Sequence, residues 1–306
     1  MMYLLRWAVV SFGVFFLLYA SLSLVVAISW RTFRKRLNAT ALFTMRVLPL
    51  FCASAIVLLV AVPSFFYLEP NSAEESVGLS GILMALGGGA IILIGVVSVV
   101  AAWRRASRFL ASCAANSRQL KTDVGVPAFE VSGPAPALLV GGVCRPRLLV
   151  SGRAAELLSQ REMDAAIRHE LAHVRRRDNL KKLVLHFCGF PFLAALDREW
   201  LTAAEIAADD AAVNDEQTAL DLASALLKIA RDSSSAPMPA LAMSLVPERG
   251  VAISARVERL LSWKRPATQR GSWLPLALIT GIAVVAVAHY PWVLAQMHEF
   301  TELLVR

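Results

Sequence analysis

The chain has 306 residues, of which 57% are hydrophobic, and its mean hydropathy is +0.58. This composition excludes an ordinary soluble protein, in which the apolar fraction is lower. The formal net charge of +8 does not indicate a nucleic-acid-binding protein, because the basic residues gather at the ends of long apolar stretches instead of forming one basic surface.

Four apolar stretches are long enough to cross a membrane, since about 30 Å of hydrocarbon takes roughly 20 residues of helix. None carries a charge in its middle. They cover residues 7–29, 47–68, 79–103 and 272–295. We therefore predict three transmembrane helices in residues 1–103 and a fourth in residues 272–306, where it is followed by a short tail.

The charges between these stretches are distributed unevenly. The loop before the second stretch and the segment after the third are rich in arginine and lysine, whereas residues 69–80 contain three glutamates and no basic residue. By the positive-inside rule, the first loop and residues 104–271 lie in the cytoplasm and both termini lie outside. We expect a multi-pass protein of the inner (cytoplasmic) membrane.

Residues 1–28 have an alternative interpretation as a cleaved signal peptide, because Arg6 precedes the apolar run and small residues occur near Ala20 to Ser23. A signal peptide carries its positive charge before the apolar core. Here the heavier cluster, Arg31 to Arg36, follows the core. These charges favour an uncleaved first helix.

Residues 104–271 are enough for one compact domain. A helical stretch continues the third span to Gln119, and two short apolar runs, 137–140 and 147–150, then surround Gly141-Gly142. Such runs, bounded by turn residues, are typical of a hairpin. We expect the second run to be an edge strand that binds substrate, made of Arg147, Leu148, Leu149 and Val150. Helical patterns follow, so the predicted fold class is α+β.

A helix is predicted to begin near residue 160, because Ser159 and Glu162 have the spacing of a capping box. This helix carries the run His169-Glu-Leu-Ala-His173. Residues four apart share a helix face, so both imidazoles can point at one ion while Glu170 reaches the attacking water. We predict His169 and His173 as ligands of one catalytic zinc ion and Glu170 as the general base.

A hydrolytic zinc site also needs a third protein ligand. The helices that follow, at about 199–213 and 220–230, offer Glu205, with Asp209 at i+4. Glu205 can bind the metal while Asp209, one turn away, accepts the free ring N–H of a zinc histidine. The pair alone would indicate an exposed acidic helix face, but together with the histidine motif it indicates a metal site.

Several spaced motifs resemble the membrane metallopeptidases of the BlaR and MecR type, the sensor-transducer proteases of beta-lactam resistance, and their relatives. The similarity covers the four-span layout with the protease between spans three and four. The matching runs are Gly141 to Val150, Leu158 to Asp178, Phe190-Pro191, Glu205 to Val213 and Leu222 to Ala230. The resemblance implies a gluzincin fold, zinc, and Glu205 as the third ligand.

The sequence also departs from that family. Members that sense antibiotics carry an extracellular penicillin-binding domain after the last span, and this chain ends at Arg306, so we expect no beta-lactam sensor in it. The residue before the aspartate is often Cys in the family and is Ala208 here. We expect zinc binding to survive that change.

The leading functional hypothesis is regulatory proteolysis of a cytoplasmic or membrane-proximal protein, for which the family implies a transcriptional repressor. A quality-control or processing protease of the heat-shock or CAAX type is an alternative, but such enzymes usually have further spans before the third ligand. Here the intervening apolar run, 183–196, is too short for a span. A non-catalytic receptor or scaffold is a third alternative, and the intact Glu170 argues against it because a structural zinc needs no base.

The topology prediction can be checked by labelling single cysteines in a background without the native ones. Cysteines introduced at Thr40 and Ser235 should react only when a reagent can enter the cytoplasm, because both positions lie in segments rich in basic residues or continuous with them. A cysteine at Glu74 should react with an impermeant reagent added outside. Labelling of position 235 from outside would contradict the arrangement.

Overall fold

The computed structural model of the chain describes residues 2–33, 37–68, 78–115, 117–120, 125–132, 136–190, 193–232, 242–244, 253–264 and 289–305. The chain forms two compact units. The first comprises residues 1–34, 45–94 and 267–306, and the second comprises residues 35–44 and 95–266. The division falls within two helices, α2 (Ala39–Ile56) and α4 (Leu79–Ala115).

Apolar helices make up the described part of the first unit. They are α1 (Met2–Phe33), most of α2, the π-helical η2 (Val57–Ala61), α3 (Val62–Leu68), the first part of α4, and α12 (Tyr290–Val305). Among the described residues, three segments have the length and composition of a membrane span: Leu5–Arg31, Ala39–Leu68 and Leu79–Ala115. They contain the first three predicted stretches. The predicted fourth, 272–295, lies mainly outside the described residues, and only its end belongs to α12.

The helices extend beyond the apolar stretches. Arg31 and Arg46, expected in the first loop, lie in α1 and α2. Before α2, the Asn38 side chain accepts a hydrogen bond of 2.9 Å from the backbone N–H of Ala41, which satisfies one of the donors that a helix start leaves open. Hydropathy thus predicts the part of a helix that hydrocarbon requires and not the helix ends.

Helices α1 and α4 approach each other closely at Gly88. A Cβ atom at this position would lie 2.3 Å from the backbone oxygen of Phe12. At the next residue, Gly89, an added Cβ would meet nothing within 4 Å. Small residues allow helix backbones to come close enough for dense packing in a membrane. Gly88 therefore permits the close approach of α4 to the backbone of α1.

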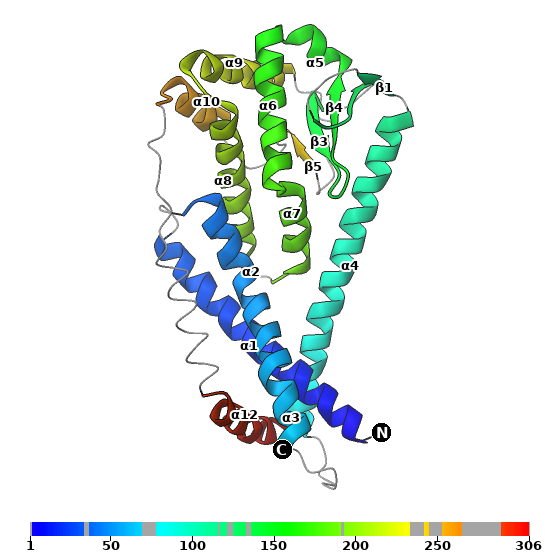
Figure 1. The fold of residues 1–306 in the computed structure, drawn as a ribbon, viewed down its shortest axis with the longest axis vertical. Helices are drawn as coiled ribbons and strands as arrows, with labels where there is room; N and C mark the ends of the chain where they lie inside the picture. Colours follow the sequence, from blue (N-terminus) through cyan, green and yellow to red (C-terminus); the bar gives the residue numbers. More distant parts are fainter. Residues whose placement is uncertain are drawn as a thin grey trace. The chain divides into compact units, whose positions relative to one another are not determined.

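The second unit contains a five-stranded mixed sheet in the order β1-β2-β4-β3-β5 (Figure 1). The strands are β1 (Ser117–Leu120), β2 (Ala128–Val131), β3 (Leu138–Gly141), β4 (Arg147–Ser151) and β5 (Ala242–Ser244). Strands β3 and β4 form the predicted antiparallel hairpin. Strand β2 pairs in parallel with β4, and β5 pairs antiparallel with β3.

Helices cover both faces of this sheet. They are the end of α4, α5 (Gly152–Leu157), α6 (Gln160–Arg176), α7 (Asp178–Phe187), α8 (Ala194–Ala212), α9 (Glu216–Asp232) and α10 (Ile253–Leu261). Leu138 and Val140 pack with α6 and α9 in the main core, whereas Leu139 packs with Cys113 of α4. Alternate residues of a strand point to opposite faces, which explains why β3 is apolar throughout. In Figure 1, α6 lies between the sheet and α8.

Helix α6 begins and ends at well-defined residues. Ser159 and Glu162 form the predicted capping box at its start. At its end, Arg177 adopts a left-handed conformation with φ of 55°, and α7 begins at the next residue, Asp178. This abrupt turn brings the first residue of α7 back toward the last turn of α6.

Several predicted elements of the second unit are confirmed, but the segment after the third apolar stretch and the sheet differ from the prediction. The helix that was expected to reach Gln119 ends at Ala115, and residues 117–120 form β1 instead. The mixed sheet, with its parallel β2–β4 pair, is larger than the predicted hairpin. The chain is mainly helical with this small sheet. Residues 233–239, whose serines and prolines are typical of a linker, lie outside the described residues.

Replacement of Gly88 by alanine should destabilise the first unit, because the new methyl group would meet backbone that cannot rotate away. Overpacking of this kind costs about 1–3 kcal/mol. The matched Gly89→Ala variant should unfold at the wild-type temperature or above it, since alanine favours a helix over glycine by about 1 kcal/mol. Thermal unfolding of the two detergent-solubilised variants measures the difference, and equal midpoints would contradict the proposed close contact.

Candidate metal centre

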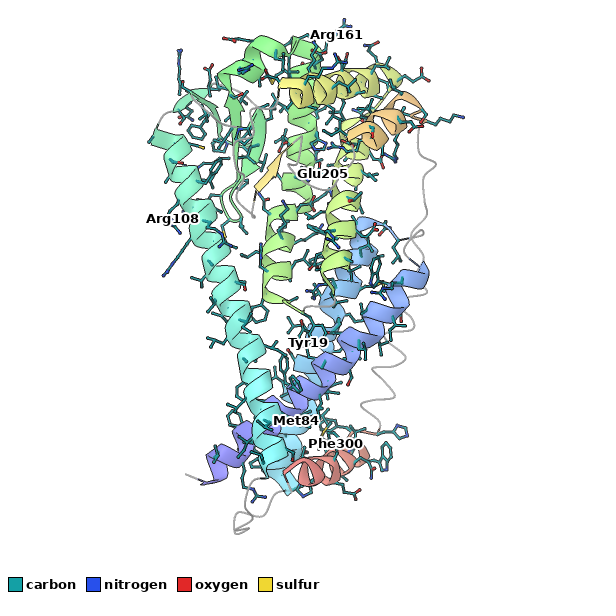
Figure 2. The ribbon with its side chains drawn as sticks, turned by 180° about the vertical axis from the view of Figure 1, so that it is seen from behind. Tyr19, Met84, Arg108, Arg161, Glu205 and Phe300 are labelled. Carbon is teal, nitrogen blue, oxygen red and sulfur yellow. The ribbon has the colours of Figure 1, made fainter. Side chains whose placement is uncertain are left out.

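Three buried side chains converge between α6 and α8. His169 and His173 extend from α6, and Glu205, labelled in Figure 2, extends toward them from α8. Their nearest ligand atoms all lie within 4.8 Å of one another. The two imidazole Nε2 atoms are 3.2 Å apart, and each lies 3.6 or 3.7 Å from a Glu205 oxygen. The structure thus brings together the three predicted ligands.

A carboxylate lies beside the other nitrogen of each histidine. Nδ1 of His169 is 2.9 Å from Oδ1 of Asp209, and Nδ1 of His173 is 2.9 Å from Oδ2 of Asp178. Ionised carboxylates only accept hydrogen bonds, so they favour the ring proton on Nδ1 and leave a lone pair on Nε2. Two lone pairs and a carboxylate facing one point form a donor set that fits a metal cation.

The same carboxylates determine the protonation equilibria of the centre. Burial disfavours the charged form of His169, but Asp209 and Glu205 outweigh it and raise the pKa of this imidazole to about 9, so a metal cation that binds Nε2 displaces a proton at neutral pH. Burial alone would raise the pKa of Asp209, and its contacts with Arg256 and His169 instead lower that pKa to about 2. Asp209 therefore remains ionised in its buried position.

Glu170 is completely buried, and its two oxygens have different surroundings. Oε2 accepts a hydrogen bond of 3.0 Å from the backbone N–H of Val140 in β3. Oε1 has no hydrogen-bond partner among the described residues. Burial raises the pKa of Glu170 to about 7. A carboxylate with one fixed oxygen, one open oxygen and a pKa near neutrality is suited to proton transfer.

Strand β3 is held against the centre by two helices. Glu170 of α6 binds the N–H of Val140, and the Asn179 side chain of α7 donates to the carbonyl oxygens of Val140 and Gly142, at 3.1 Å each. These side chains satisfy polar groups on the strand border away from β4. They also fix the distance between β3 and the histidine helix.

The prediction that Arg147, Leu148, Leu149 and Val150 form a strand at the edge of the sheet is wrong. These residues belong to β4, which pairs with β2 on one side and with β3 on the other. Leu148 to Val150 are buried in the cores on the two faces of the sheet, and the Arg147 guanidinium lies over the Phe129 ring at 5.7 Å. Strand β3, and not β4, contacts Glu170.

Two residues of the centre were not identified from the sequence. Asp178 directly follows three arginines, a position that on sequence alone indicates an ion pair with them or a helix cap. It does contact Arg176 and Lys181, at 3.2 and 3.1 Å, but it also binds His173. Arg256 lies on α10, a helix that was not predicted, and it contacts both Asp209 and Glu205. The sequence marks Asp178 only as an acidic residue directly after the histidine helix. No local pattern marks Arg256.

Residues 69–260 match the family described as BlaR1 peptidase M56, and this match covers more than half of the chain and every residue of the centre. A search of curated proteins found no match. The family match indicates a membrane-associated metallopeptidase, in agreement with the apolar helices and with the metal-binding donor set.

The two carboxylates behind the histidines should affect metal retention. Asp178→Asn and Asp209→Asn preserve shape while weakening the acceptor that orients each ring, and such changes typically cost about 10–100-fold in metal affinity or activity. Asp210→Asn is the matched control, because Asp210 is adjacent to Asp209 but pairs at the surface with Arg259. Metal content after dialysis against a chelator measures the effect. Equal retention by all three variants would exclude the orienting role.

Proposed function

We propose that this chain, which belongs to the BlaR1 peptidase M56 family, is a zinc-dependent endopeptidase with His169, His173 and Glu205 as ligands and Glu170 as general base. One observation carries the proposal. Both histidines present Nε2 to the same point, each is backed by a carboxylate, and Glu170 lies on the same helix with one open oxygen.

The donor set supports zinc as the metal. Two imidazoles and one carboxylate are the protein ligands of a class of catalytic zinc sites that keep a further position open. When bound, zinc supplies Lewis-acid chemistry, in which it polarises a carbonyl oxygen and lowers the pKa of water. Soft thiolate ligands, which would favour other metals, do not occur in the cluster of the described residues.

Glu170 is proposed to transfer the protons of peptide hydrolysis. The Val140 N–H holds Oε2, so Oε1 remains to accept a proton from the water that attacks the peptide carbonyl. A pKa near 7 allows the same carboxyl group to return that proton to the leaving amine nitrogen. Buried surroundings exclude competing water from the transfer.

The proposed setting is regulatory proteolysis at the inner membrane. The charge distribution supports a cytoplasmic catalytic domain at residues 104–271, with both termini outside. A peptidase family implies a protein substrate, and the apolar helices imply contact with the lipid bilayer. A transcriptional repressor is the substrate that the resemblance to the sensor-transducer proteases favours.

Glu170→Gln should separate metal binding from catalysis. The glutamine keeps the shape and the contact with β3 but cannot accept the proton, so zinc should stay while cleavage falls by about 100–10,000-fold. His169→Ala should lose both zinc and cleavage. Zinc content and cleavage of the chain itself or of a co-expressed candidate repressor are measured side by side in membranes.

Glu156→Gln serves as the control, because Glu156 is exposed on α5 and outside the centre. It should match the wild type in both measurements. Cleavage by Glu170→Gln at the wild-type rate would show that Glu170 is not the base. Full zinc occupancy in His169→Ala would remove the ligand assignment.

A further inference from the structure

Arg256 lies at the centre of the buried charges on α8. Only 1% of its surface is exposed. Its Nε and Nη2 atoms donate to the two oxygens of Asp209 at 2.7 and 2.6 Å, and its Nη1 atom lies 3.1 Å from Oε2 of Glu205. One guanidinium therefore contacts both the candidate metal ligand and the carboxylate that supports His169.

The two carboxylates need such a partner. Glu205 and Asp209 are one helical turn apart, and both are buried, so two negative charges would lie close together without a cation between them. A planar guanidinium fixes the plane of the carboxylate that it binds through two parallel hydrogen bonds. In this plane Oδ1 of Asp209 is also 2.9 Å from Nδ1 of His169. The orientation of Asp209 toward the histidine thus depends on Arg256.

We infer that Arg256 is a positioning residue of the metal centre, which holds the carboxylates of Glu205 and Asp209 in the orientation that metal binding requires. This inference rests on the proposed zinc site. It assigns α10 a role in the centre although this helix supplies no ligand. The guanidinium acts through Asp209 and Glu205 and does not itself contact the metal.

The chain contains an internal comparison for this role. One turn further along α10, Arg259 donates to both oxygens of Asp210, at 2.6 and 2.8 Å. This second pair joins the same two helices, also through two hydrogen bonds, although Arg259 uses Nη1 and Nη2 where Arg256 uses Nε and Nη2. Its side chains are 43% and 35% exposed and lie outside the cluster of ligands. An arginine that only fastens α10 to α8 should behave like Arg259.

The experiment compares Arg256→Gln, Arg256→Lys and Arg259→Gln in the full chain, solubilised in detergent. Zinc affinity is measured by competition with a chelator, and the absorption spectrum of the cobalt-substituted protein reports ligand geometry. We expect Arg256→Gln to lower zinc affinity by about 10–100-fold, as for other residues behind a metal ligand. Its cobalt spectrum should differ from that of the wild type. Arg259→Gln should change the affinity by less than about 3-fold, the value of an exposed pair, and keep the spectrum.

Arg256→Lys tests the geometry separately from the charge. Lysine retains the positive charge but cannot form the two parallel hydrogen bonds that fix the carboxylate plane. The zinc affinity of the Arg256→Lys protein should therefore lie between those of the wild type and Arg256→Gln. In an Asp209→Asn background, Arg256→Gln should cost less than in the wild type, because the residue through which it acts is already altered.

Two results would overturn the inference: an Arg256→Gln protein with wild-type zinc affinity and cobalt spectrum, or equal losses in Arg256→Gln and Arg259→Gln. If Arg256→Gln does not fold, Arg256→Lys decides, and an unaltered affinity and spectrum in that variant reject the role. A wild-type chain that binds no zinc would instead reject the proposed function itself. The two failures are therefore distinguishable.

Discussion

The burial of charge between α6 and α8 is the constraint on which the second unit depends. Each buried ionised group without a partner would cost several kcal/mol, and here carboxylates, imidazoles and a guanidinium are buried together. Their mutual contacts require α6, α7, α8 and α10 to pack in one relative position, in which these side chains meet. Asp178 at the start of α7 and Arg256 on α10 satisfy charges that α6 and α8 cannot satisfy alone. The apolar packing of the sheet and of α9 then holds these helices in that position.

The parts of the site that follow from local spacing could be predicted from the sequence. The capping box fixes the start of α6, and the i, i+4 spacing places His169 and His173 on one face, because a helix repeats its direction over that interval. Glu205 and Asp209 follow the same rule on α8. The apolar helices could be predicted equally well, because the length of a hydrophobic stretch is a local property of the sequence. The ends of these helices could not be predicted.

The remaining features depend on contacts between residues far apart in the chain, which the sequence does not reveal. Strands of three to five residues carry too little periodicity to reveal which neighbour they take, so β2 and β5 were missed and β4 was mistaken for an edge strand. Asp178 reaches His173 only because Arg177 adopts a left-handed conformation. Arg256 meets Asp209 across a long separation in the chain, and an arginine in an amphipathic segment carries no sign of a buried partner.

The position of α10 in the chain has a consequence for biosynthesis. All three candidate ligands, and the carboxylates behind both histidines, are translated before residue 256. Until then the nascent chain holds Glu205 and Asp209 without the guanidinium that joins them in the folded protein. The centre is therefore completed only after α10 has been translated and has docked, and a chain that stops before residue 256 carries the ligands without a finished site.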